Sequence, residues 1–202
     1  FWETGKLDPE SNVQFGEGGA GTFSDGKLTT RIKDLRCRKV LEEMAEAGAP
    51  EEILWDAKPH IGTDLLRGVV RNIREKIIAL GGEVRFHAKV SGFVWENGKI
   101  RAVLLENGER LETEDAVLAL GHSARDTFEL LEREGFALEQ KPFAVGVRIE
   151  HPQEMINRAQ YGAAAENLPA ADYRLTYTTK AGRGVYTFCM CPGGMVVAAA
   201  SE

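Results

Sequence analysis

The stretch Ala116-Val117-Leu118-Ala119-Leu120-Gly121 decides the fold class that we expect for this chain. A short, continuous apolar run is typical of a strand buried on both faces of a sheet, and the glycine after it permits a tight turn. Residues 126–134 then show the pattern of a helix that Gly135 ends. A strand, a glycine turn and a helix in this order present backbone N–H groups to a ligand. The stretch therefore predicts a mixed α/β (α+β) fold.

An antiparallel β-meander is expected directly before this run. Asn97-Gly98 and Asn107-Gly108 are both hairpin-turn dipeptides, so the sequence predicts three antiparallel strands over residues 90–115. Alternating apolar residues predict a further strand over residues 83–90. The meander would thus connect a helical part to the buried strand.

Three helices are expected before the meander. Apolar residues at helical spacing predict a long helix over residues 64–80, with Thr63 as its N-cap and a double glycine at its end. A shorter helix is predicted over residues 36–47, stopped by Gly48, and a third, short helix follows it.

A smaller, β-rich domain is predicted for residues 141–202. Residues 143–149 alternate between apolar and polar side chains, which is typical of a strand. Pro152 is well placed in the first turn of a short helix. Further alternation predicts strands over residues 173–177 and 185–191.

The composition is that of an ordinary soluble globular protein, with 43% hydrophobic and 28% charged residues. No apolar run is long enough to span a bilayer, and three cysteines, an odd number, argue against a disulfide framework. The formal net charge of -6 disfavours a nucleic-acid backbone as the main partner. We therefore expect a cytoplasmic protein without a nucleic-acid or membrane partner.

Residues 16–21 read Gly-Glu-Gly-Gly-Ala-Gly and satisfy the G-x-G-x-x-G spacing of a dinucleotide-binding loop. That motif needs a helix that begins within it, where the pyrophosphate can lie. Residues 22–30 contain another glycine, two adjacent threonines and no apolar stripe, so we expect no helix there. Four glycines in six residues nevertheless let the backbone approach a flat or anionic ligand closely. A mobile surface loop is the alternative.

Five blocks of the sequence closely resemble the uncharacterised FAD-dependent dehydrogenase family of bacteria, in the glutathione-reductase-like class of flavoproteins. The blocks read SNVQFGEGGAGTFSDGKL (residues 11–28), KPHIGTD (58–64), GHSARDT (121–127), GVRIEHP (146–152) and CMCPGG (189–194). The likeness covers essentially the whole chain, and blocks of this length are specific.

The resemblance implies a Rossmann-type FAD-binding domain, represented in part by residues 1–140, and a substrate domain, represented by residues 141–202. The dinucleotide fingerprint of such proteins would lie before Phe1, and a closing glycine-aspartate motif after Glu202. We therefore expect an internal fragment of an FAD-dependent oxidoreductase of unknown substrate, inactive and free of flavin by itself. The flavin would carry out hydride chemistry on a small-molecule substrate, with NAD(P)H as a candidate electron donor.

The resemblance also implies which residues face the cofactor. The strand over residues 83–90 would pass the adenine, and the glycine-rich loop would lie near the pyrophosphate and the flavin ring. The implied FAD contacts are Gly16, Gly18, Gly19, Gly21, Thr22, Ser24, Asp25, Lys27, Val90, Gly121, His122 and Ser123.

Lys27, His60 and His122 are the candidate catalytic residues. Lys27 would stabilise negative charge on a reduced flavin ring; the alternative is a solvated lysine beside a turn held by Asp25. His60 would donate a proton near neutral pH, unless it is a structural histidine held by hydrogen bonds. His122 follows the predicted buried strand, where α/β active sites gather, or else it holds the turn.

Arg148 is the candidate substrate ligand, since arginine grips carboxylates with two hydrogen bonds. It shares one face of a predicted strand with Glu150, so an ion pair on a solvated sheet is the alternative. Cys189 and Cys191 share one face of another predicted strand, as a redox dithiol or as buried core cysteines. No further ligands stand near them, and we expect no metal site.

Two other functions stay open. A non-enzymatic module that binds a small molecule or a protein would not respond to FAD. A tRNA-modifying flavoprotein would share the fold class, but the acidic charge and the lack of a basic patch argue against it. Apolar surface left by missing segments would favour association, so an oligomer could result from truncation alone.

Overall fold

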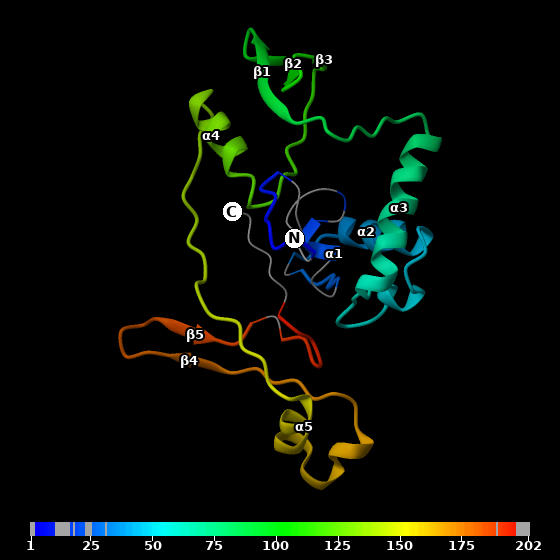
Figure 1. Ribbon diagram of the computed structural model, residues 1–202, viewed down its shortest axis with the longest axis vertical. Coiled ribbons are helices and arrows are strands. Elements are labelled where there is room, and N and C mark those ends of the chain that lie inside the picture. Colours follow the sequence, from blue (N-terminus) through cyan, green and yellow to red (C-terminus); the bar gives the residue numbers. More distant parts are fainter. Residues whose placement is uncertain are drawn as a thin grey trace. The chain divides into compact units, whose positions relative to one another are not determined.

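The computed structural model describes residues 3–10, 17, 19–22, 26–30, 32–188 and 190–196, which divide into two units (Figure 1). Unit 1 extends to Pro142, and unit 2 begins at Phe143. Each unit contains helices and a small antiparallel sheet. The chain is therefore of the mixed α/β kind that the sequence predicts. That the units are an FAD-binding and a substrate domain stays a prediction.

Unit 1 is built from short helices and a three-stranded sheet. Its elements are α1 (Gly19–Thr22), α2 (Arg36–Glu46), the 3-10 helix η1 (Glu51–Leu54), α3 (Thr63–Ala79), β1 (Val90–Glu96), β2 (Lys99–Leu105), β3 (Arg110–Glu112) and α4 (Arg125–Arg133). The helices predicted over residues 36–47, 64–80 and 126–134 are confirmed, each to within one residue at either end.

One turn of helix, α1, lies inside the glycine-rich loop itself and ends at Thr22. The described residues after it, 26–30, form no helix, as expected. Glycine and threonine are poor helix formers. α1 nevertheless packs against α3, and tertiary contact of this kind overrides local propensity. A single turn of four residues is still far from the longer helix that the dinucleotide motif requires.

The long helix α3 ends in a Schellman motif. Gly81 has a φ of 88°, and the Gly82 N–H donates to the Ile77 carbonyl at 2.9 Å. The start of the helix differs from the prediction. Thr63 is the first residue of α3, and Gly62 precedes it without any side-chain cap.

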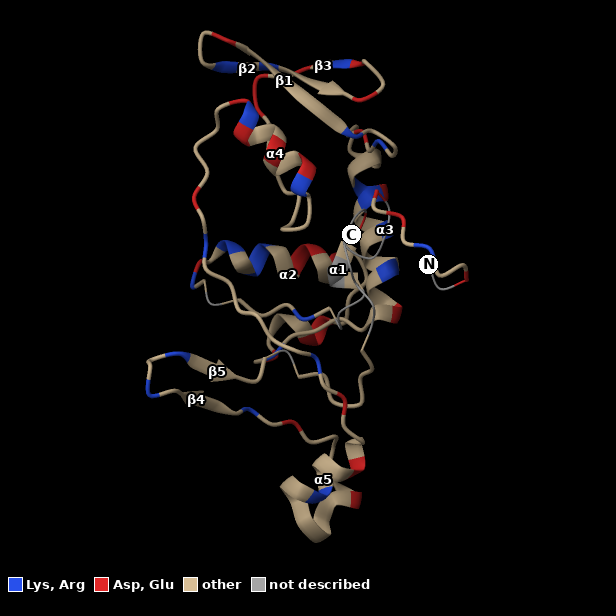
Figure 2. Ribbon diagram, turned by 60° about the vertical axis from the view of Figure 1, so that its left-hand side comes forward, with Lys and Arg blue, Asp and Glu red and all other residues tan. Residues whose placement is uncertain are grey.

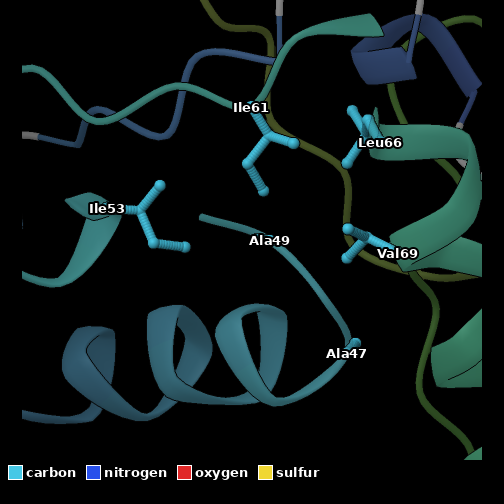
Figure 3. Close-up of a cluster of buried hydrophobic side chains, with 6 residues drawn as sticks. All are labelled: Ala47, Ala49, Ile53, Ile61, Leu66 and Val69. Atoms are coloured by element: carbon cyan, nitrogen blue, oxygen red, sulfur yellow. The ribbon is translucent and has the colours of Figure 1, made fainter. Parts of the chain in front are cut away.

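The helical core of unit 1 lies between α2, η1 and α3. Figure 3 shows Ile53, Ile61, Leu66 and Val69 pointing toward one another, with two alanines on the loop after α2. Ile61 is 0% exposed, and complete burial of such a side chain contributes about 1.5–3 kcal/mol. Because Ile61 follows His60 directly, its burial fixes the segment that carries His60.

The charges of α2 run against its helix dipole. Its basic residues lie in its first half and its acidic residues in its second half (Figure 2), whereas the dipole favours the opposite order. Lys76 of α3 offsets this: its Nζ lies 2.6 Å from Glu43 and 2.8 Å from Glu46. Asn72 also donates to the Ala47 carbonyl at 2.7 Å. α2 and α3 are therefore joined at the end of α2.

The predicted meander is confirmed, with β1, β2 and β3 antiparallel in that order. Asn97 and Gly98 have φ of 53° and 74°, as a type I′ hairpin turn requires. Phe93 of β1 packs against Leu130 and Leu131 of α4 in a second buried cluster. The sheet is thus stabilised by a helix that follows it in the chain.

Two strands predicted in unit 1 are wrong. Residues 83–89 form no ladder and bend at His87, whose φ is 54°, so the strand begins only at Val90. Residues 116–120 also form no strand, and Val117 is 91% exposed. A strand buried on both faces needs partners on both edges, and no other described segment pairs with this run.

The described part of unit 2 contains an α-helix, a 3-10 helix and a β-hairpin. Its elements are α5 (Gln153–Tyr161), the 3-10 helix η2 (Gly162–Asn167), β4 (Thr176–Thr178) and β5 (Gly184–Tyr186). Pro152 precedes α5, as predicted. The strand predicted over residues 143–149 is wrong, because these residues pair with no described segment and Val147 is 93% exposed. In the described parts of both units, no helix has the length and apolar character to cross a membrane.

Candidate functional site

Two candidate catalytic residues, Lys27 and His60, lie directly opposite each other in an isolated antiparallel bridge. The Leu28 N–H donates to the Pro59 carbonyl at 2.9 Å, and the Ile61 N–H donates to Gly26 at 3.0 Å. These bonds flank the bridge, so Lys27 and His60 form the closer, non-hydrogen-bonded type of pair, with Cα atoms about 4.5 Å apart. Side chains of such a pair leave the bridge on one face, and both residues are exposed.

Gly26 makes this close approach possible. It is buried and has a φ of 55°, in the left-handed region. A Cβ at this position would lie 2.0 Å from the Ile61 carbonyl oxygen, inside any permitted contact. Glycine is therefore required where the segment of Lys27 meets the buried Ile61.

Thr22, at the end of α1, is 5% exposed, and its Oγ1 makes no hydrogen bond within the described residues. A buried hydroxyl without a partner costs about 1–3 kcal/mol. In a loop rich in glycine, such an atom is suited to a ligand. The loop is also tied to α3, because Glu17 accepts a hydrogen bond from Arg74 at 2.9 Å.

Four of the implied FAD contacts of the loop lie outside the described residues: Gly16, Gly18, Ser24 and Asp25. Gly19 begins α1 with a φ of 45° and Gly21 continues it. Val90 begins β1 and packs against the cluster around Phe93.

Gly121, His122 and Ser123 lie on a separate exposed or half-buried segment, directly before α4. Gly121 has a φ of 71°, and the Ser123 Oγ lies 3.4 Å from Nδ1 of His122. Lys27 and His60 are therefore adjacent in the structure, whereas His122 lies on another segment of unit 1.

An ion-pair group holds the segment after His122. Lys89 lies 2.9 Å from Glu10 and 3.1 Å from Asp126. The pKa of Lys89 is raised by its bonds to Glu10 and Asp126, and the bond to Lys89 lowers the pKa of Asp126. Three segments far apart in the sequence meet here, and no local pattern signals such a meeting.

In unit 2, Gln153 joins two of the blocks that carry the family resemblance. Its Oε1 accepts the Gly193 N–H at 2.7 Å. Its Nε2 donates to Asn157 Oδ1 at 2.7 Å and to the Ala171 carbonyl at 2.9 Å. The segments around His151 and Gly193 are therefore held together. Gln153 belongs to no motif, and no sequence pattern singles it out.

His151 and Tyr173 form a second polar pair of unit 2. His151 Nε2 lies 2.9 Å from Tyr173 Oη, and the Tyr173 N–H contacts Met190 Sδ at 3.1 Å. Glu150 accepts a hydrogen bond from the Val196 N–H. Both residues of the pair are half-buried.

Arg148 is exposed and lies in no strand, so the predicted strand face shared with Glu150 is wrong. The carboxylate of Glu150 bonds the Val196 backbone. Cys189 lies outside the described residues. Cys191 is half-buried and also lies outside any strand, so the predicted strand that would align the two thiols is not observed there.

The comparisons with known proteins concern both parts of the chain. Residues 142–202 match the family model described as "FAD-dependent protein, C-terminal domain-like". The whole chain is 60% identical, over 205 residues, to a curated "Uncharacterized protein" of Clostridium beijerinckii. The chain spans 38% of the length of that relative. The family match supports the predicted link to FAD-dependent proteins.

Proposed function

We propose that this chain is the central part of an FAD-dependent oxidoreductase that acts on a small molecule. The observation that carries the proposal is the match of residues 142–202 to an FAD-dependent family. The activity is assigned to a longer protein, because the chain spans 38% of its relative. In this proposal unit 1 belongs to a Rossmann-type FAD-binding domain and unit 2 to a substrate domain.

The described residues of unit 1 fit a flavin nucleotide in two respects. Thr22 has a buried hydroxyl that lacks a partner within the described residues, and such a group can bond a ligand oxygen or nitrogen. Gly19 and Gly21 beside it have no side chains that would block a close approach. Together with the implied contacts of the loop, these residues would hold the cofactor.

Lys27 and His60, which pair in the bridge, would supply a positive charge and a proton for the reaction. A bound flavin accepts or donates a hydride, and the protein sets the electrostatics around it. The Lys27 ammonium would stabilise negative charge that develops on a ligand at this face. His60, on the same face, would donate or accept a proton.

The whole Clostridium beijerinckii relative tests the proposal. Because it is 60% identical over this entire chain, it should share the cofactor. We expect the purified protein to show the absorption spectrum of bound flavin, or to acquire it when incubated with FAD. NAD(P)H, the candidate electron donor, should then bleach that spectrum in the absence of oxygen. A colourless protein that takes up no FAD would overturn the proposal.

The 202-residue chain provides a second comparison. By itself it is expected to purify without flavin, and a rise in its melting temperature with FAD would show that unit 1 retains part of the site. A non-enzymatic binding module is the alternative, and it predicts no response to FAD in either protein. A tRNA-modifying flavoprotein would instead show RNA binding that weakens steeply with salt.

A further inference from the structure

We propose that unit 2 carries a binding site of its own for a neutral small molecule with an amide or imide group, which His151 and Glu150 hydrogen-bond. The site is a shallow depression at the start of α5. It is lined by Glu150, His151, Pro152, Gln153, Gly193, Gly194 and Met195. This site goes beyond the proposed function, because it stands whether or not the chain binds FAD.

His151 is oriented by Tyr173. Its Nε2 lies 2.9 Å from the Tyr173 hydroxyl, whereas its Nδ1 makes no hydrogen bond to any described residue. In a pair of a phenol and a neutral imidazole, the phenol O–H is the better donor and the imidazole nitrogen the better acceptor. Tyr173 therefore donates to Nε2, and the imidazole proton stays on Nδ1. His151 then offers a ligand an N–H donor, which suits a carbonyl oxygen.

Glu150 supplies the complementary acceptor. One oxygen of its carboxylate accepts the Val196 N–H, and the other accepts no hydrogen bond from the described part of the chain. A donor and an acceptor that line one depression match a carbonyl beside an N–H, as in an amide or imide. No lysine or arginine is among the described residues that line the depression. The negative charge of Glu150 therefore disfavours a carboxylate or phosphate ligand.

The two walls of the depression are fixed before a ligand arrives. Gln153 links them, because its Oε1 accepts the Gly193 N–H at 2.7 Å while its Nε2 bonds Asn157 and Ala171. Tyr173 is held in turn by its N–H contact to Met190 Sδ at 3.1 Å. A site whose walls are already joined loses less entropy on binding.

Three pyrimidines test this assignment on the unaltered chain. Uracil is a neutral imide, orotate is the same ring with a carboxylate, and 1,3-dimethyluracil lacks both N–H donors. In ¹H–¹⁵N spectra, we expect uracil to shift the Gly193 and Gly194 amides and the His151 ring nitrogens in a saturable manner. Dimethyluracil should bind at least several-fold more weakly, and orotate should produce no shift.

Variants of His151 and Tyr173 separate the roles of these two residues. His151→Phe should abolish the uracil shifts, and the matched His87→Phe at an exposed position of unit 1 should leave them unchanged. Tyr173→Phe should move the imidazole proton of His151 away from Nδ1, which the ring ¹⁵N shifts would report. It should also weaken the binding of uracil. Failure of uracil to shift the His151 ring in the unaltered chain overturns the proposal, as does equal binding of orotate. The probe comparison needs no variant to fold.

Discussion

Gly26 is the residue on which the Lys27–His60 bridge depends. Replacing it by alanine would force a φ of 55° on a residue with a side chain and place a Cβ 2.0 Å from the Ile61 carbonyl. Left-handed strain and overpacking together cost about 2–5 kcal/mol. We therefore expect Gly26→Ala to lower the free energy of unfolding in urea by that amount, and to break the contacts between Lys27 and His60 in NMR spectra.

Gly135 supplies the control for this substitution. Its φ is 84°, but a Cβ there would meet no atom within 4 Å. Gly135→Ala should therefore cost only the left-handed strain, about 1–2 kcal/mol. If both variants lose the same free energy of unfolding, the close approach of Gly26 to Ile61 adds nothing to the cost of the substitution.

The Glu43 carboxylate predicts a pH dependence of stability. Its bonds to Lys39 and then to Lys76 lower its pKa from 4.5 to about 2. A carboxyl group whose pKa is lower in the folded state stabilises that state above its unfolded pKa. This stability is lost as the pH falls from about 4.5 to about 2. The effect is modest, because exposed ion pairs are screened by solvent and salt.

Melting curves recorded between pH 2 and 7 would measure this contribution. We expect Glu43→Gln to lower the melting temperature slightly at pH 7, with a difference that shrinks below pH about 4.5 and in high salt. Glu75→Gln on α3 is the control, since Glu75 makes no ion pair within the described residues. A constant difference at every pH would rule out the ion pairs as its cause.

The kinds of residue in the candidate site could be predicted from the sequence, but their pairing could not. Lys27 and His60 stood out through the glycine turn and the family blocks. Their apposition depends on the φ of Gly26 and on the burial of Ile61 in a core built from three helices. Such contacts arise only when distant segments pack, so they leave no local pattern.

At the scale of elements, local signals were reliable and long-range ones were not. α2, α3 and the Asn97-Gly98 hairpin were predictable because helical spacing and turn dipeptides act within a few residues. The strands expected over residues 116–120 and 143–149 depend on partners elsewhere. Within the described residues they find none, and both segments stay exposed. Apolar content alone did not decide their structure.

Gln153 shows how one side chain organises an element. It ties α5 to Ala171 and Gly193, and a lost bond that leaves a buried partner costs about 1–3 kcal/mol. We expect Gln153→Ala to speed hydrogen exchange of the Gly193 amide by at least tenfold. In the 202-residue chain, the free energy of unfolding should fall by about 1–3 kcal/mol.

Gln160→Ala is the matched control on the same helix, because Gln160 is exposed and makes no hydrogen bond through its side chain to a described residue. It should leave the exchange of the Gly193 amide unchanged. If both variants exchange alike, α5 is not held through Gln153 but through its apolar face around Ile156.

At the scale of the whole molecule, the two units differ in how much core they contain. In the described part of unit 2, the buried hydrophobic residues are Ile156 and Ala171, whereas unit 1 has two buried clusters. Large apolar side chains such as Phe143 and Phe188 are 83% and 82% exposed. A domain of about 60 residues is marginal even with a well-formed core.

We therefore expect residues 143–198 produced alone to be unfolded, whereas residues 1–142 keep a cooperative transition. Circular dichroism and the dispersion of ¹H–¹⁵N spectra would measure both. Ile61 and Val69 belong to a buried cluster made of residues of unit 1, so its melting curve should stay sigmoidal. A cooperative transition in the shorter piece would mean that the hydrogen bonds of Gln153 and Tyr173 stabilise unit 2 without a large apolar core.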